Sequence, residues 1–552
     1  MTPETIRSSD ADLTGIDPRR LFLGSCLSLI ATSVGFAVVA ASLFPLKAAF
    51  GLANKDVGWI AGASLGGCTV SMLVLGSLCD ALGMKRVLRV ALVCHLAGPL
   101  LMISATGPAA FWMLFGGALI LALGNGAVQA ACNPLVTTIY PDRKTEKLAH
   151  FHLWFPGGIL IGAVLSFLFD KAGAPFWQLK LGLILVPTVI YGLLFTGQKF
   201  PVTERVQSGV SFGEMLRETF YRPLFLVLLL CMMITASLEL APGAWIPAVL
   251  RAGGIPGILV LAYINGLMAV LRSFAGAVGR ALSNASILLI SAAVAGIGLT
   301  MLSYSTSTWF AFLSATVFAV GVCYFWPMMI GTTAERVTKG GPLALAVMGA
   351  TGMLAAGLIA PPAMGYIADG YLHERLVDNE QKTVAALDEV AVTYAPLVPA
   401  PPEGVASRDI QGAVESVKDA LAGYGRDGKL PEGKTAGALR AAVDSGPPDD
   451  ASGPLGKPAA QARRRAAALL HEADNHGGLM SFRYVAPLSL VVVVIFGILC
   501  IRDRSKDLHK PAAAADAREA PGESPAAQEA AAGESPEGGA EGEPEAGRDE
   551  TP

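Results

Sequence analysis

The chain has 552 residues, of which 53% are hydrophobic and only 15% are charged, and its mean hydropathy is +0.52. This composition is far from that of soluble domains and is typical of a protein that resides in a lipid bilayer. The formal net charge is -3, with 41 basic and 44 acidic residues, so the sequence lacks the basic field expected of a nucleic-acid-binding protein.

Twelve apolar runs are long enough to cross a hydrocarbon core of ~30 Å as helices of about 20 residues. We therefore predict an all-α membrane protein with twelve transmembrane helices in two six-helix halves. The predicted spans are 21–46, 57–79, 87–105, 110–138, 149–169, 177–198, 223–250, 255–279, 285–304, 308–331, 342–371 and 482–501.

Basic residues orient the predicted bundle, because short cytoplasmic loops retain Lys and Arg. With the N-terminus inside, twenty Lys and Arg residues fall in inside segments and five in outside loops and helix ends. This asymmetry predicts a multi-pass protein of the inner (cytoplasmic) membrane with both termini in the cytoplasm. The expected parts are a cytoplasmic N-terminus (1–20), a first half (21–198), a cytoplasmic linker (199–222), a second half (223–502), an extracytoplasmic insertion within it (373–481) and a cytoplasmic tail (503–552).

A charged motif follows the second predicted span. Residues 76–86 read GSLCDALGMKR, which fits the pattern G-x-L-x-D-x-x-G-x-K-R in a tight turn. Here the chain resembles the major facilitator superfamily, a transporter family whose signature loop joins spans two and three. The equivalent turn of the second half, GAVGRALSNA at 276–285, is a degenerate copy. The resemblance implies that this motif is a gate element of the transporter. The alternative is a charge cluster that only sets the membrane topology. The residues of the motif are Gly76, Asp80, Gly83, Lys85 and Arg86.

Span four carries Asn125, Gln129 and Asn133 at four-residue steps, so these amides share one face of a helix. An amide in a bilayer needs a partner from a neighbouring helix, water or a ligand. We interpret this face as lining a substrate cavity. Alternatively, Asn133 supports the helix at the break before Pro134 and does not contact the substrate. The competing interpretation for the whole face is hydrogen bonding between helices. His95 in span three is expected to be a hydrogen-bonded packing residue.

Ionisable residues deep in spans are candidates for function. Glu239 in span seven and Arg272 in span eight differ in estimated depth by roughly 12 Å, so the spacing does not establish a direct ion pair, and the alternative is that both face one aqueous cavity. Glu239 is a candidate for proton coupling, and Arg272 is either an anion partner or a structural residue. Asn265 shares a face of span eight with Arg272.

Tryptophans accompany these polar groups at Trp154, Trp245 and Trp326. Sugars present apolar faces that stack on aromatic rings and hydroxyls that pair with amides. The predicted substrate-binding residues are Asn125, Gln129, Trp154, Glu239, Trp245, Asn265 and Trp326. Aromatic residues also anchor membrane interfaces, which is the alternative for each of them.

The insertion 373–481 is polar and rich in alanine. Stretches such as AVESVKDALAGYG favour helix, whereas PLVPAPPEGVAS breaks it. A small helical cap and a partly disordered insertion are both compatible with this pattern, and we favour disorder. The tail after Lys510 has eleven acidic residues against Arg518 and Arg548, and it is expected to be disordered.

Three further stretches resemble fucose-permease-like sugar transporters: GNGAVQAACNPLVTTIYP, FPVTER and ERVTKGGPLALAVMGATG. In the fucose–proton symporters of that branch, an acid in span four and another in span one serve coupling and sugar binding. Here Gln129 occupies the span-four position and span one carries no acid, and a glutamine cannot titrate. Proton symport through Glu239 and facilitated transport therefore both remain open.

The leading interpretation is a secondary transporter, not an enzyme, that moves a sugar or related neutral metabolite by alternating access. No phosphate-binding loop, catalytic triad or metal-ligand spacing appears, and no cofactor or metal is expected. The expected partners are a small-molecule substrate, the lipid bilayer and, for symport, protons; we expect a monomer. The alternatives are transport of amphipathic or anionic compounds through Arg272, and a transporter-like membrane sensor that signals through the insertion or the tail.

Overall fold

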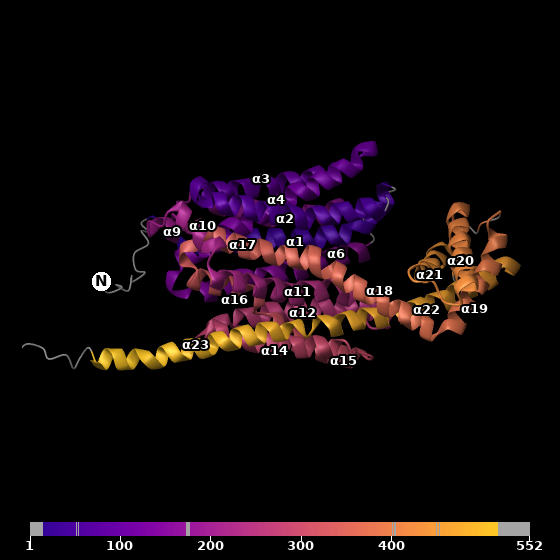
Figure 1. Cartoon of the computed structure of the whole chain (residues 1–552). Helices are drawn as coiled ribbons and strands as arrows, with labels where there is room; N and C mark the ends of the chain where they lie inside the picture. Colours follow the sequence, from indigo (N-terminus) through magenta and orange to yellow (C-terminus); the bar gives the residue numbers. More distant parts are fainter. Residues whose placement is uncertain are drawn as a thin grey trace, which may run out of the picture. The chain divides into compact units, whose positions relative to one another are not determined.

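A computed structural model describes residues 15–516 except 51, 53, 173–176, 400, 402–404, 449 and 452. These residues form α-helices joined by short turns, and no strand occurs among them. Eleven helical segments of the described chain are long and apolar enough to cross a membrane, and a twelfth consists of two helices bent by 58°. The predicted all-α fold with twelve spans is therefore confirmed (Figure 1).

The first half contains six spans in chain order, followed by two short linker helices. Its elements are α1 (Pro18–Phe50), α2 (Asn54–Leu82), α3 (Met84–Ile103), η1 (Gly107–Ala109), α4 (Ala110–Ile139), η2 (Pro141–Arg143), α5 (Lys144–His152), α6 (Trp154–Lys171), α7 (Trp177–Gly182) and α8 (Leu185–Phe195), and the linker helices are α9 (Glu204–Gln207) and α10 (Phe212–Phe220).

The second half contains the other six spans and the insertion. Its elements are α11 (Pro223–Ala252), α12 (Gly257–Ser273), α13 (Ala275–Ala281), α14 (Asn284–Leu302), α15 (Thr308–Val322), α16 (Phe325–Arg336), η3 (Thr338–Gly340), α17 (Gly341–Leu354), the π-helical η4 (Ala355–Ile359), α18 (Ala360–Asp378), α19 (Glu380–Tyr394), η5 (Ala395–Leu397), α20 (Ser407–Asp427), α21 (Lys434–Ser445), α22 (Gly453–Val485) and α23 (Leu488–Asp516).

Small residues allow the spans to approach closely, as at the crossing of α3 and α4. A Cβ at Gly98 would lie 2.7 Å from the carbonyl oxygen of Gly117, and a Cβ at Gly117 would lie 2.7 Å from that of Gly98. Lipid tails are as apolar as the helix surfaces, so the hydrophobic effect does not drive helices together in a bilayer. Close backbone contact of this kind stabilises the helix pair by van der Waals packing instead.

Two spans are interrupted at proline-dependent breaks. The span made of α5 and α6 breaks at Leu153, and that made of α15 and α16 breaks at Cys323 and Tyr324. Pro156 and Pro327 lie four residues after His152 and Cys323. Because proline has no backbone N–H, the carbonyls of His152 and Cys323 lose their usual helical donors and are available to side chains.

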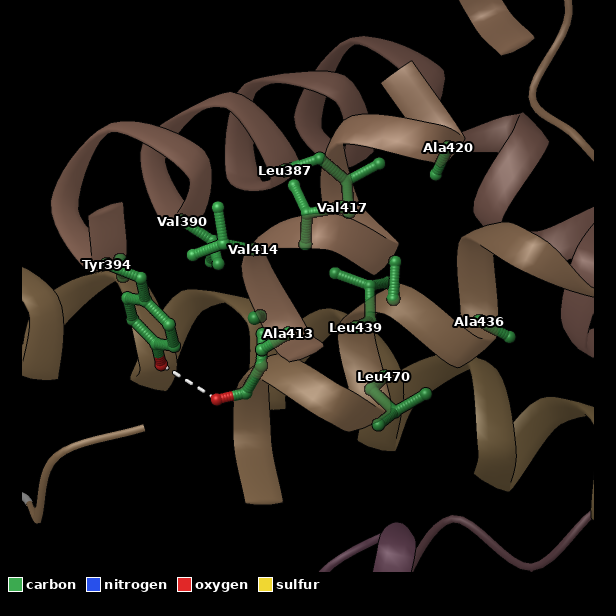
Figure 2. Packing of buried hydrophobic residues seen from close by; sticks show 14 of the residues in the cluster. Leu387, Val390, Tyr394, Ala413, Val414, Val417, Ala420, Ala436, Leu439 and Leu470 are labelled. Carbon is green, nitrogen blue, oxygen red and sulfur yellow. Dashed lines mark hydrogen bonds between the residues drawn. The ribbon is translucent and has the colours of Figure 1, made fainter. Parts of the chain in front are cut away.

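The insertion between the last two spans is folded, so our interpretation of 373–481 as partly disordered is wrong for its described residues. Helices α19 to α22 form a cap at one end of the bundle (Figure 1). Its core includes Leu387, Val390, Val417 and Leu439, with alanines between them (Figure 2). Tyr394 donates a hydrogen bond of 2.7 Å to the carbonyl of Ala442, which joins α19 to α21.

The cap is joined to the second half through α22, which packs against α18 and α11. Gly477 lies against the backbone of Ala368, and Gly478 lies against the side chain of Val249. Asn475 donates to the carbonyl of Val249 at 2.9 Å. The spans on either side of the insertion thus extend into the cap as α18 and α22.

The residues from Ile498 onward form a unit separate from 1–497. Residues 503–516, expected in the tail, belong to helix α23, which ends at Asp516. The predicted disorder of 517–552 lies outside the described residues.

Candidate functional site

A cavity lies between the two halves of the bundle. Its lining comes from eight spans, four in each half, and combines polar groups with aromatic rings. The lining residues are Thr32, Phe36, Cys68, Gln129, His152, Phe155, Glu239, Leu240, Arg272, Trp326 and Met353. A mostly apolar pocket with a few convergent polar groups is the usual form of a small-molecule site.

The amide face of α4 divides between two roles. Gln129 lines the cavity, and its amide oxygen accepts a hydrogen bond of 3.1 Å from Asn133. Asn133 in turn pairs with His152 Nε2 at 3.0 Å, so it braces the cavity wall from behind. Asn125 does not line this cavity; its amide oxygen pairs with His95 Nε2 at 3.0 Å. Helix-to-helix bonding therefore accounts for Asn125, and cavity contact for Gln129.

His95 is a packing residue, as expected. It is buried, and its second ring nitrogen pairs with the hydroxyl of Tyr191 at 3.2 Å. The Asn125–His95–Tyr191 chain satisfies polar groups of α4, α3 and α8 within the first half.

Arg272 is buried at the centre of the molecule and binds both halves. Its Nε donates to the carbonyl of Cys323 at 2.5 Å, and one terminal nitrogen donates to the carbonyl of His152 at 2.8 Å. These are the two carbonyls that lack helical donors because of Pro327 and Pro156. One guanidinium therefore satisfies a helix break in each half.

The remaining terminal nitrogen of Arg272 donates to Glu239 Oε1 at 2.9 Å, forming a buried ion pair. The depth estimate from the sequence left this ion pair open, and the structure shows both the pair and a common cavity that the two residues line. The estimate counted residues along the helices and took no account of the length of the arginine side chain. The carboxylate of Glu239 thus balances the charge of the Arg272 guanidinium.

Trp326 is the one predicted tryptophan that lines the cavity as described; it is 8% exposed, and its Nε1 has no hydrogen-bond partner. Trp154 does not line this cavity and is 36% exposed. Trp245 lies near Gly365 of α18, and Asn265 donates to the carbonyl of Leu261. The geometry gives these last three residues no contact with the cavity.

Sequence reasoning missed Thr32, Phe36, Phe155, Met353 and the role of His152. The four nonpolar or weakly polar residues carry no signal that separates a cavity wall from a packed core. His152 did carry one, because a proline four residues later predicts a free carbonyl at its position.

The predicted gate motif lies at the end of the bundle that carries α9 and α10. Asp80 accepts from Arg205 Nε and from the hydroxyl of Thr203, each at 2.5 Å. The charged partner of Asp80 is therefore Arg205 of linker helix α9. Lys85 donates to the carbonyl of Gln198 at 2.7 Å, whereas Arg86 is exposed.

Gly76 and Gly83 have separate backbone roles in the motif. A Cβ on Gly76 would overlap that of Ala346, so glycine allows α2 of the first half to contact α17 of the second. Gly83 begins α3 with φ of +82°, a conformation that glycine adopts without strain. The motif thus builds a tight turn and a close contact between halves.

Further polar bonds join the two halves at this end. Thr145 of α5 donates to Glu335 of α16, and Asn284 donates to Thr145 at 3.0 Å. On the linker, Glu214 pairs with Lys339 at 2.9 Å, and this lysine holds the pKa of the Glu214 carboxyl below its usual range. The halves are therefore in contact at the α9–α10 end of the structure.

Comparison with known proteins agrees with this architecture. Residues 21–286 match the model of the Major Facilitator Superfamily. A D-xylose transporter of Levilactobacillus brevis is 25% identical over 161 residues, which are 29% of this chain and 34% of that transporter. The match thus spans about a third of the length of this relative.

Two solved transporters share the fold. The E. coli fucose:proton symporter FucP aligns with a TM-score of 0.53 at 16% identity, covering 64% of this chain and 92% of the symporter. The proton:xylose symporter XylE, bound to 6-bromo-6-deoxy-D-glucose, aligns with a TM-score of 0.53 at 14% identity, covering 64% of this chain and 90% of XylE. Residues 21–286 thus match a family of transporters and not of enzymes, and the likeness to these two structures shows the same fold.

Proposed function

We propose that this protein is a secondary transporter of the major facilitator superfamily that moves a small neutral polyol, a sugar or a related metabolite, across the inner membrane by alternating access. The observation that carries the proposal is a pair of buried polar atoms without partners at one cavity. Trp326 Nε1 offers a hydrogen-bond donor, and Glu239 Oε2 offers an acceptor. A substrate hydroxyl both donates and accepts, so it can satisfy the two together.

The charge balance of the cavity favours a neutral substrate over an anion. Arg272 is 1% exposed, and each of its three guanidinium nitrogens donates one hydrogen bond. The acceptors are two backbone carbonyls and the carboxylate of Glu239. An anionic substrate would have to displace the carboxylate from this pair and leave it buried without a partner, at a cost of several kcal/mol. This pairing counts against the alternative of an anionic substrate, which depended on Arg272 as the residue that binds the anion.

The resemblance of FucP and XylE supports the same substrate class, since both are named for sugars. Among the residues described as lining the cavity, Glu239 is the one acid, which makes it the candidate proton carrier. Uptake into vesicles with and without a collapsed proton gradient distinguishes symport from facilitated transport.

Trp326→Phe tests the site. The substitution removes the unpartnered donor and keeps the aromatic face, so we expect unchanged folding and a three- to tenfold rise in KM for the transported sugar, about one hydrogen bond. Uptake of a panel of neutral sugars and organic anions into proteoliposomes is the measurement. Trp154→Phe, whose ring does not line the cavity, is the matched control.

Gln129→Ala is the second arm, and we expect it to abolish saturable uptake without loss of membrane expression. Unchanged uptake in both Gln129→Ala and Trp326→Phe would remove the substrate from this cavity. Saturable uptake of organic anions with no uptake of sugars would overturn the substrate class.

A further inference from the structure

A groove lies on the first half between α3 and α8, away from the substrate cavity. It opens at the end of the bundle where α3 begins and α8 ends. Its walls are mainly apolar, and its two charged residues are both basic. The lining residues are Lys85, Leu88, Arg89, Leu92, Tyr191, Gly192, Phe195, Thr196, Gly197 and Phe200.

The cations of this groove are available to a ligand. Arg89 is exposed on the second turn of α3, and Lys85 uses one donor on the carbonyl of Gln198 at 2.7 Å. No acid is among the described residues of the lining. Asp80, the nearest acid in sequence, is already bonded to Arg205. The groove therefore carries net positive charge at the edge of the spans.

The carbonyl groups at the C-terminal end of α8 do not neutralise the cations of the groove. Arg20 of α1 donates to the carbonyls of Leu194 at 2.9 Å, Leu193 at 3.2 Å and Thr196 at 3.3 Å. Arg20 thus neutralises the negative end of the α8 dipole, and Arg89 and Lys85 are left for a partner from outside the chain.

The surroundings of the groove are those of a lipid-facing surface. Val93 on α3 is 62% exposed and Leu193 on α8 is 64% exposed, so the flanks present aliphatic side chains outward. The groove itself combines basic residues at the span ends with Leu92 and Phe195 deeper along the helices. Basic residues at a membrane surface above an apolar cleft match a lipid with an anionic headgroup and acyl chains.

We propose that this groove binds an anionic phospholipid, with its phosphate between Lys85 and Arg89 and an acyl chain along Leu88, Leu92 and Phe195. A soluble anion does not account for the apolar walls, and a zwitterionic lipid does not account for two unopposed cations. The site is independent of the transported substrate, because it lies within one half and shares no lining residue with the cavity.

The test uses the full-length protein purified in a mild detergent, with phosphatidylglycerol and phosphatidylcholine of the same acyl chains. Native mass spectrometry measures bound lipid, and thermal unfolding measures stabilisation. We expect phosphatidylglycerol to be retained preferentially, and Arg89→Gln to weaken it about fivefold, the contribution of one basic residue at a membrane surface. Arg89→Lys should keep most of the retention.

Two variants control for charge and for shape. Arg280→Gln removes an exposed cation from the equivalent turn of the second half and should leave lipid retention unchanged. Thr196→Phe keeps both cations but fills the groove with a ring, and it should reduce retention like Arg89→Gln.

Three outcomes would overturn the proposal. One is equal retention of the two lipids, and another is full retention by Thr196→Phe, which would mean surface charge without a built site. The third is equal thermal stabilisation by inorganic phosphate alone, which would indicate an anion site and not a lipid site.

Discussion

At the scale of single residues, Arg272 links the two halves of the bundle through three hydrogen bonds. It is held by the carbonyls of Cys323 and His152 and by the carboxylate of Glu239. The two carbonyls come from different halves and are free because Pro327 and Pro156 interrupt their helices. Any rocking of one half against the other has to lengthen or exchange the bond from Arg272 to His152.

Removal of one member of the Arg272–Glu239 pair should cost more than removal of both. Arg272→Met leaves Glu239 buried without its partner, and we expect it to lower the free energy of unfolding by about 3–5 kcal/mol. Arg272→Met combined with Glu239→Met should recover part of this loss, because no uncompensated charge remains. Thermal unfolding of the detergent-purified variants is the measurement.

Arg280→Met, at an exposed position, should stay within about 0.5 kcal/mol of the parent protein. A double variant that is no more stable than Arg272→Met alone would show that the carbonyl bonds, and not the ion pair, dominate the contribution of Arg272.

At the scale of helices, α2 and α17 meet at the predicted gate motif. Gly76 leaves no room for a Cβ beside Ala346, so the two helices touch where one half meets the other. The contact is strengthened nearby by Asp80 and Arg205, both less than a tenth exposed. At the α9–α10 end, the helices are thus held together by the close packing of Gly76 against Ala346 and, nearby, by the ion pair between Asp80 and Arg205.

Gly76→Ala should therefore open the α9–α10 end, because the added methyl group overlaps Ala346. Ala346→Gly restores the space, so the double variant Gly76→Ala with Ala346→Gly should close again. The readout is the labelling rate of a cysteine placed at Thr138, which is 3% exposed and lines the pocket at this end. We expect at least tenfold faster labelling in Gly76→Ala, a shift of about 1.4 kcal/mol.

Labelling of the parent protein without the Thr138 substitution gives the background of the eight native thiols. If the double variant labels as fast as Gly76→Ala alone, direct overlap with Ala346 is not the cause of opening.

The spans could be predicted from sequence because runs of about 20 apolar residues have few alternatives. The cap was predicted only as the alternative to a partly disordered insertion, because the segment is polar and much of its core consists of small residues such as Ala413, Ala420 and Ala436. The buried face of α20 does carry an apolar pattern in Ile410, Val414 and Val417.

The site was predictable only in part, for geometric reasons. Gln129, Glu239 and Trp326 were found because polar or aromatic groups in apolar spans are rare. Trp154 does not line the cavity, and its presence in a span carried no signal of the direction in which the ring points. The reach of the Arg272 side chain to Glu239 is a property of the fold and not of residue spacing.

At the scale of the whole bundle, the described residues fall into a first half, a second half and a cap that is joined to the second half. The cap is connected at both ends to the spans of that half, through α18 and α22, and α22 also packs against α11. Close contacts at Gly477 and Gly478 leave little room for the cap to shift on this support. The cap should therefore move with the second half as one body when the halves rock.

Distances from the cap to matched positions in the two halves test this. Val392 on α19 is 72% exposed, and Trp112 on α4 and Trp309 on α15 are each 70% exposed near the first turns of their spans. Spin labels at Val392 and Trp309 should give one distance distribution in all conformational states, because both belong to the second half. Labels at Val392 and Trp112 should give a distribution that shifts when Gly76→Ala opens the α9–α10 end, since motion of one half against the other changes only this pair. Equal shifts in both pairs would mean that the cap moves independently of the second half, and Gly478→Leu, which crowds Val249, should produce that behaviour deliberately.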